Sequence, residues 1–189
     1  MSFRAALPDP SVLNVAGFEW LPAVKAIASG VGQVYLCDSW ISGVLIIVGI
    51  CICSRISFAF ALIGSISGML YAYAVGASSD EIFLGLWGYN PVLAAMAIGG
   101  VFFVINWQTA IIATLCAFTS ALMFGMFKIF FTVWGLPSCT FGFCSAALIF
   151  LFLKNAVPYM TPMALADITT PEGNRHLVAK RRELAEKGE

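Results

Sequence analysis

Charged side chains are scarce in this 189-residue sequence, since they make up 11% of it, whereas hydrophobic residues make up 60%. The mean hydropathy is +0.92. Soluble globular domains have an apolar share nearer one half, so this composition excludes an ordinary soluble domain and favours a protein that is surrounded by lipid. Ten basic residues balance ten acidic ones, which gives no reason to expect nucleic acid as a partner.

Groups that carry out catalysis are also scarce. The one histidine, His176, lies in the C-terminal tail, and neither the H-E-x-x-H metal motif nor the G-x-S-x-G nucleophile motif occurs. The six cysteines lie in or beside apolar runs, where a free thiol behaves as a small hydrophobic group. Cys51 and Cys53 have no histidine nearby, so we interpret them as packing residues. The sequence therefore predicts neither an enzyme nor a metal or cofactor site.

The few charges are distributed unevenly along the chain. Between Arg55 and Lys154, the only acidic or basic side chains are those of Asp80, Glu81 and Lys128. We interpret Asp80 and Glu81 as solvated carboxylates beside a polar turn at the membrane interface. The distribution predicts three parts, which are an N-terminal segment over 1–19, a membrane domain over 20–160 and a C-terminal tail over 161–189.

The tail predicts the orientation of the chain. Its basic residues follow the last apolar run, and the positive-inside rule places them in the cytoplasm. Residues 172–189 are predicted to form a short surface helix. The alternative, functional interpretation is that this helix is a patch that binds lipid or a partner. Residues 1–15 lack the apolar core of a signal peptide, so insertion is expected to use an internal span.

The apolar runs predict an all-α integral membrane protein with about five transmembrane helices. A transmembrane helix needs about 20 apolar residues. Two stretches, 56–75 and 109–127, are uncharged and long enough to span a bilayer. Three shorter or less regular runs, over 41–53, 91–105 and 141–153, are expected to be tilted, broken or extended by neighbours.

Two further segments, over 20–36 and 81–90, predict re-entrant half-helices. Each is apolar but interrupted by glycine, and such interrupted segments point to a transport site because half-helices leave backbone groups free for a solute. Gly64-x-x-x-Gly68 predicts close helix packing. Ion or proton coupling normally requires a titratable residue at mid-membrane. None is evident, which favours passive movement of a neutral solute.

Motifs on these segments resemble those of the urea transporter family in their order and spacing. The matching residues are Gly32-Gln33-Val34-Tyr35, Ser42-Gly43, Gly85-Leu86-Trp87-Gly88-Tyr89-Asn90, Trp107-Gln108-Thr109, Leu136-Pro137-Ser138-Cys139-Thr140, Phe143-Cys144 and Thr170-Pro171-Glu172-Gly173-Asn174-Arg175. The resemblance implies two inverted repeats of about five spans and a re-entrant helix each, which enclose one pore, with three subunits per assembly.

This chain resembles the second repeat alone, and the resemblance implies a first repeat that would precede Met1. We therefore expect a chain that conducts after pairing with a second copy or a partner repeat. The alternative is a non-conducting membrane subunit or a truncated fragment that assembles with a full-length transporter. A channel for another small neutral solute, such as ammonia or water, is a further alternative. The resemblance also implies location in the plasma membrane.

The resemblance assigns uncharged residues to a urea pathway, which are Gln33, Val34, Leu36, Tyr89, Leu93, Thr140 and Phe143. It implies that Gln33 accepts hydrogen bonds at a wide vestibule and that Thr140 stands at the central constriction. The remaining residues would form flat or narrow walls. Gly142 replaces the proline usual in the family, and Ser39-Trp40 replaces the customary Asn-Pro.

Urea suits such a pathway because it is planar, with four in-plane N–H donors and one carbonyl acceptor. Oxygen acceptors replace the water that urea sheds, while flat apolar walls exclude bulky solutes and hydrated ions. The expected partners are therefore urea or a similar neutral solute, membrane lipid and further copies of the chain. No cofactor or energy source is implied.

Overall fold

The computed structural model describes residues 20–152, 157 and 160–187, so the predicted segment 1–19 lies outside the described residues. The described residues form helices, and Phe103 and Pro162 form an isolated β-bridge. Its elements are α1 (Trp20–Gly32), η2 (Gln33–Tyr35), α2 (Trp40–Cys53), α3 (Arg55–Ala74), α4 (Ser79–Phe83), α5 (Tyr89–Met96), η3 (Ala97–Val101), α6 (Trp107–Thr132), α7 (Phe141–Phe152), η5 (Leu165–Asp167) and α8 (Pro171–Lys187).

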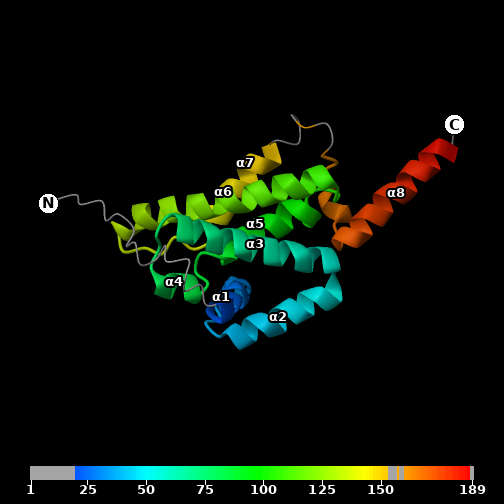
Figure 1. Ribbon diagram of the computed structural model, residues 1–189. Helices are drawn as coiled ribbons and strands as arrows, with labels where there is room; N and C mark the ends of the chain where they lie inside the picture. Colours follow the sequence, from blue (N-terminus) through cyan, green and yellow to red (C-terminus); the bar gives the residue numbers. More distant parts are fainter. Residues whose placement is uncertain (1–19, 153–156, 158–159, 188–189) are drawn as a thin grey trace.

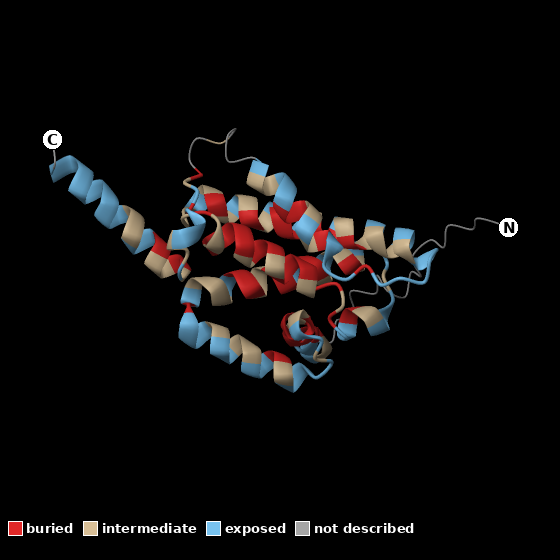
Figure 2. Ribbon diagram, turned by 180° about the vertical axis from the view of Figure 1, so that it is seen from behind, coloured by how far each residue is buried: buried red, intermediate tan, exposed pale blue. Residues whose placement is uncertain are grey.

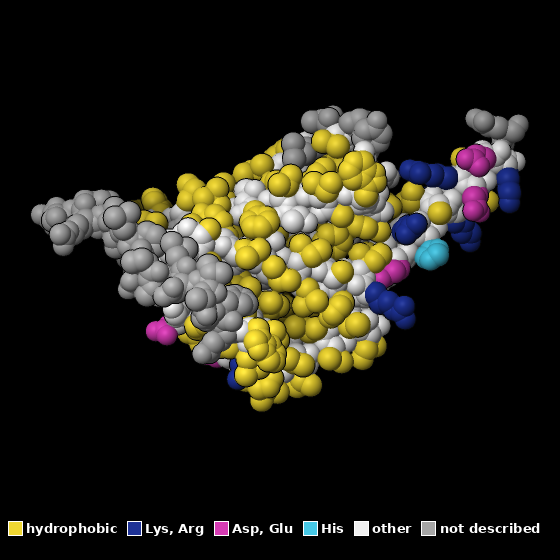
Figure 3. Space-filling model, in the orientation of Figure 1, with side chains coloured by type: hydrophobic (Ala, Val, Ile, Leu, Met, Phe, Trp, Pro, Cys, Tyr) yellow, Lys and Arg dark blue, Asp and Glu magenta, His cyan; other side chains and the backbone are white. Residues whose placement is uncertain are grey.

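The helices form a bundle from which α8 projects (Figure 1). Helices α3, α5 and α6 lie side by side, with α7 next to α6 and the pair α1 and α2 on the opposite side of α3. Buried residues are concentrated on α1, α3, α5 and α6, whereas exposed residues predominate on α2 and α8 (Figure 2). Apolar side chains cover the bundle, and the charged ones gather on α8 (Figure 3). This is the surface of an all-α membrane protein.

Within the described part of the chain, two helices are long and apolar enough to cross a membrane by themselves. These are α3, with 20 residues, and α6, with 26 residues, so the spans predicted over 56–75 and 109–127 are confirmed. The α1–η2 segment and α2 together form a third candidate that bends by 77° at its break. Helices α5 and α7 are apolar but shorter, in keeping with the irregular runs expected there.

The two segments predicted as re-entrant are short helical pieces that end in tight turns. The first ends at Leu36, whose φ of 57° lies in the left-handed region, before the chain turns into α2. The second consists of α4, a turn in which Gly85 has φ 78°, and the start of α5. Helix α5 begins at Tyr89, two residues before Pro91. Proline is tolerated within the first turn of a helix, so Pro91 does not interrupt α5.

Glycines on α3 allow a neighbouring backbone to approach very closely. A Cβ atom on Gly64 would lie 2.5 Å from the Cα of Val92, and one on Gly68 would lie 2.2 Å from the carbonyl oxygen of Trp87. The predicted packing role of this glycine pair is therefore confirmed. The end of α1 is equally close, because a Cβ on Gly30 would lie 2.4 Å from the Ser65 Oγ. Small residues thus bring three backbone segments together.

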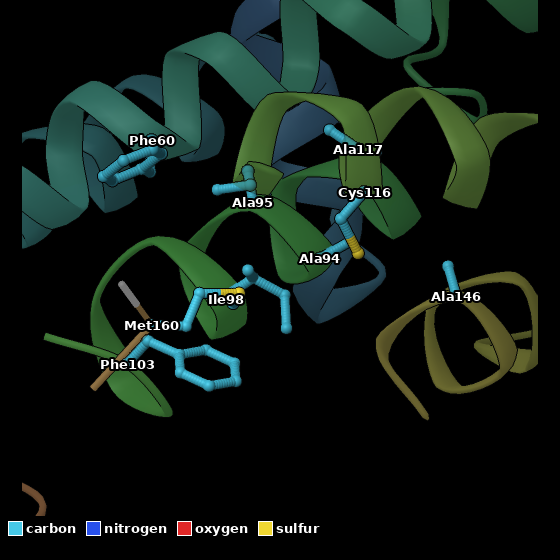
Figure 4. Close-up of a cluster of buried hydrophobic side chains, with 10 residues drawn as sticks. Phe60, Ala94, Ala95, Ile98, Phe103, Cys116, Ala117, Ala146 and Met160 are labelled. Atoms are coloured by element: carbon cyan, nitrogen blue, oxygen red, sulfur yellow. The ribbon is translucent and has the colours of Figure 1, made fainter. Parts of the chain in front are cut away.

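The largest cluster of buried apolar side chains lies where α3, α5, α6 and α7 meet (Figure 4). Many of its members are small, including Ala94, Ala95, Ala113 and Ala117, which are fully buried. Small side chains let the helix axes approach closely, and dispersion contacts then stabilise the bundle where lipid offers no hydrophobic driving force. In contrast, Cys51 and Cys53 are exposed on α2, so their interpretation as packing residues within this chain is wrong.

The start of α8 is tied to the bundle through two polar side chains. The Glu172 carboxylate accepts hydrogen bonds from the Ser54 hydroxyl at 2.7 Å and from the Ile56 N–H at 3.0 Å, which satisfies a backbone donor in the first turn of α3. Asn174, which is fully buried, donates to the carbonyl oxygen of Gly100 at 2.9 Å. The surface helix predicted after residue 172 is thus confirmed over its described part and is anchored at one end.

The capping interaction lowers the pKa of Glu172. Desolvation acts to raise the pKa of the carboxyl group, but the hydrogen bonds from Ile56 and Ser54 outweigh it and hold the pKa below the ordinary value of 4.5. A carboxyl group whose pKa is lowered on folding stabilises the protein above its unfolded-state pKa. The stabilisation is lost as the pH falls through the folded-state pKa.

We predict that Gly68→Ala lowers the free energy of unfolding by about 1–3 kcal/mol, because the new methyl group forces the α3 and α5 backbones apart. Thermal unfolding in detergent measures the change. Gly49→Ala is the matched control, since a Cβ on Gly49 meets no atom within 4 Å. Equal melting temperatures for the two variants would refute the close crossing.

We predict that Glu172→Ala destabilises the protein by about 1 kcal/mol at neutral pH through loss of the α3 cap. The difference from the wild type should shrink as the pH falls below 4.5 and the wild-type carboxylate becomes protonated. Thermal melts at a series of pH values test this, with Glu186→Ala on the exposed part of α8 as the control. A difference that is constant over the whole pH range contradicts the cap.

Candidate functional site

Gln33 lies at the end of the first broken segment, with only 4% of its surface exposed. Its Nε2 donates one hydrogen bond to Asp38 Oδ1 at 2.9 Å and one to the carbonyl oxygen of Leu84 at 3.1 Å. Both partners are acceptors, so they identify the amide nitrogen and fix the orientation of the carboxamide. The side-chain oxygen is therefore the group with which Gln33 can accept a hydrogen bond from a solute.

A close backbone contact brings Leu84 to Gln33. A Cβ on Gly85 would lie 2.3 Å from the backbone nitrogen of Gly30, so the turn after α4 packs directly against the end of α1. Gly85 also adopts φ 78°, which glycine reaches without steric cost. The two broken segments thus meet through backbone atoms, and the carbonyl oxygen of Leu84 is held within reach of Gln33.

A second polar group lies at the start of α5. The Tyr89 hydroxyl donates to the carbonyl oxygen of Cys139 at 2.6 Å, and the Asn90 side chain donates to the same oxygen at 3.2 Å. The Asn90 Oδ1 accepts a hydrogen bond from the Phe143 N–H at 2.9 Å. Because Asn90 is fully buried, it ties the loop before α7 firmly to α5.

These hydrogen bonds determine which groups of the loop before α7 remain unbonded. The carbonyl oxygen of Cys139 already accepts two hydrogen bonds, whereas the adjacent Thr140 is exposed. Cys139 has φ 42°, which turns the chain sharply before α7 begins at Phe141. Thr140 is thus one of several exposed residues of this turn, which also include Cys139 and Phe141. Phe143 is half-buried, and its ring packs against the main core.

Gly142 lies inside the first turn of α7 rather than in a loop. A Cβ there would be 2.8 Å from the backbone nitrogen of Phe124 and 2.9 Å from the carbonyl oxygen of Ser120. The glycine therefore allows α7 to approach α6 closely.

The remaining predicted pathway residues differ in their exposure. Val34 packs at the edge of a buried cluster with Val31 and Val92, and Leu93 is half-buried on α5. Leu36 is 84% exposed at the left-handed end of η2. The structure therefore joins the Gln33 region to the Tyr89 region through the turn that follows α4, while Leu36 projects from the surface.

Aromatic rings pack against the polar group at the start of α5. The ring of Phe124 packs edge-on against Trp87, with centroids 5.2 Å apart, and against Tyr89, with centroids 5.6 Å apart. These contacts fix the plane of the Tyr89 ring beside its hydrogen bond to Cys139. Phe124 carried no motif signal in the sequence, because its partners come from a distant segment.

The interpretation of Glu81 as a solvated carboxylate is wrong. Glu81 forms an ion pair with Lys128 and accepts a hydrogen bond from the indole N–H of Trp87 at 3.0 Å. The cluster borders a pocket of about 550 Å³ between α3, α4 and α6, and none of the predicted pathway residues lines it. Asp80 is exposed, as expected.

Sequence reasoning missed two residues that hold the site together, Asp38 and Asn90. Asn90 stands inside one of the recognised motifs, and Asp38 lies five residues after Gln33, but spacing alone does not show which partner each side chain binds. Ser65 on α3 also contributes, because its hydroxyl donates to the carbonyl oxygen of Ile27 at 2.8 Å. These polar side chains satisfy backbone and amide groups near the places where the helices break.

The sequence of the chain is similar to that of known proteins. A family model described as "Urea transporter" matches residues 2–155. The relatives include Urea transporter 1 of Ovis aries, 36% identical over 178 residues, which cover 92% of this chain and 46% of the relative. Urea transporter 1 of Mus musculus is 36% identical over 170 residues, 89% of this chain and 44% of the relative.

The chain spans about half the length of the curated relatives that it matches. The matched residues include both broken segments and the turn before α7, where the polar groups described above lie. The extent of the family match and the similarity to these relatives lead to the same conclusion. The chain belongs to the urea transporter family.

Proposed function

We propose that this chain supplies one half of a passive pathway for urea across the membrane. The single observation that supports this most strongly is the oriented carboxamide of Gln33, whose two N–H groups are occupied by Asp38 and Leu84. An acceptor held in this way suits a solute that is rich in N–H donors. The proposal therefore assigns the vestibule to Gln33.

The other proposed pathway residues suit the shape and polarity of urea. Val34, Leu93 and Phe143 provide apolar surface, and Tyr89 provides a ring whose hydroxyl is already bonded to Cys139. A flat solute slides along such walls, whereas an ion would lose its hydration without compensation. Thr140 offers an uncharged hydroxyl at the constriction. The movement is passive because the proposed pathway holds no charged side chain.

The exposure of this region supports a requirement for a second repeat. Leu36, which we assign to the pathway, is 84% exposed, and the adjacent Tyr35 is 68% exposed. A second copy of the chain or a partner repeat would cover these residues and complete the walls. The family resemblance adds assembly as a homo-oligomer with three subunits to this proposal.

The orientation and location are part of this proposal. The basic residues of α8 place the C-terminus in the cytoplasm by the positive-inside rule, and the family resemblance favours the plasma membrane. A non-conducting subunit that assembles with a full-length transporter is the principal alternative, because the chain spans only 46% of its relative from Ovis aries. A channel for another small neutral solute is the second alternative.

Radiolabelled urea uptake into vesicles that contain only this chain tests the proposal. We expect uptake above that of empty vesicles, and a decrease of about fivefold for Thr140→Val, because one hydrogen bond contributes about 1 kcal/mol. Thr119→Val is the matched control, since its hydroxyl bonds within α6 to the Leu115 carbonyl oxygen.

The outcomes separate the candidate functions. Uptake no faster than in empty vesicles would support the non-conducting subunit. If Thr140→Val leaves urea uptake unchanged, Thr140 is not part of the pathway, but the proposed channel function stands. Faster uptake of ammonia than of urea would favour the other neutral solute.

Asn90 and Tyr89 provide a graded test of the turn before α7. We predict that Asn90→Leu destabilises the protein by about 1–3 kcal/mol, because it removes the acceptor for the Phe143 N–H, and that it slows urea uptake strongly. Tyr89→Phe should cost about 1 kcal/mol and slow uptake less, since Asn90 still holds Cys139. Melting temperatures and urea uptake measured on the same preparations check this order. Equal effects of the two variants would contradict it.

A further inference from the structure

We propose that Asp38 is a positioning residue for the urea pathway, because it determines which atom of the Gln33 carboxamide faces the solute. The inference rests on the proposed function and adds a residue to it. Asp38 lies in the loop between η2 and α2, is exposed, and accepts a hydrogen bond from the almost fully buried Gln33 amide nitrogen at 2.9 Å.

The carboxamide needs this second partner because its two ends have nearly the same shape. Rotation of the amide by 180° would exchange its oxygen and its nitrogen with little change in packing. The carbonyl oxygen of Leu84 occupies one N–H at 3.1 Å. The Asp38 carboxylate occupies the other, and hydrogen bonds to a carboxylate are about twice as strong as neutral ones. If the Gln33 amide were reversed, its oxygen would face the Asp38 carboxylate and the Leu84 carbonyl oxygen, which are both acceptors.

The consequence for the pathway is a site that accepts hydrogen bonds and does not donate them. With both amide protons bound, Gln33 presents only its oxygen to a solute. The N–H groups of urea satisfy that oxygen, whereas a rotated amide would present N–H donors and repel them. Asp38 therefore contributes to the selection of N–H donors through Gln33.

Replacement of Asp38 by asparagine tests this role. The side chain of the introduced asparagine can either accept from or donate to the Gln33 carboxamide, so the amide is no longer confined to one orientation. We expect Asp38→Asn to slow urea uptake about 3- to 10-fold, the range that corresponds to the net contribution of one hydrogen bond. Asp80→Asn is the matched control, because it removes an exposed carboxylate from α4 and should change uptake less than about twofold.

A spectroscopic measurement on the same variants distinguishes positioning from folding and does not depend on transport. In the wild type, NMR should show the two Gln33 side-chain amide protons protected from exchange with solvent, and Asp38→Asn should remove that protection from one of them. Melting temperature should change little, because Asp38 is exposed.

Slower uptake together with the loss of protection supports the inference. Unchanged uptake in Asp38→Asn alongside a conducting wild type would overturn it, and so would unchanged protection of the Gln33 amide. Absence of uptake by the wild type would instead refute the proposed function, and the NMR measurement alone would then decide whether Asp38 orients Gln33.

Discussion

The fold depends on contacts between backbones that only small side chains permit. Gly64 and Gly68 of α3 lie against the start of α5, and Gly85 lies against Gly30 at the end of α1. A methyl group at any of these four positions would lie within 3.0 Å of another residue. Helix α3 is therefore the support on which both broken segments are placed, and the polar groups of the proposed pathway keep their positions because these backbones cannot move apart freely.

The polar side chains beside these contacts satisfy the groups that helix breaks leave free. In a membrane, an unpaired backbone group costs several kcal/mol, so a broken helix is stable only where protein satisfies it. Asn90 does this for Phe143 and Cys139, and Glu172 does it for the first turn of α3. The structural network thus occupies most polar atoms near the breaks. The side-chain oxygen of Gln33 and the hydroxyl of Thr140 are the groups that we assign to the solute.

Much of the helical framework could be predicted from the sequence because it follows from continuous local patterns. Uncharged runs of membrane-spanning length marked α3 and α6, and the glycine spacing marked the contact face of α3. The motif residues gave the family, since several of them recur in the expected order. Local composition also placed both breaks, because glycine and proline interrupt apolar runs there.

Pairings between distant residues could not be predicted in the same way. Glu81 and Lys128 are 47 residues apart, and nothing in the local pattern showed that α4 and α6 bring them together. The close contact of Gly142 with the α6 backbone was likewise not evident from its motif. The roles of Asp38 and Asn90 depend on which acceptor each faces, which is a property of the folded chain.

The central claim is that the chain carries half of a urea pathway and conducts when a second repeat covers the exposed surface near Leu36. Urea permeability of individual vesicles, measured together with the number of fluorescently labelled chains in each vesicle by photobleaching, tests it most directly. The account predicts background permeability for vesicles that hold one chain and measurable urea flux for vesicles that hold two or more. Urea flux above background through a single chain would contradict it.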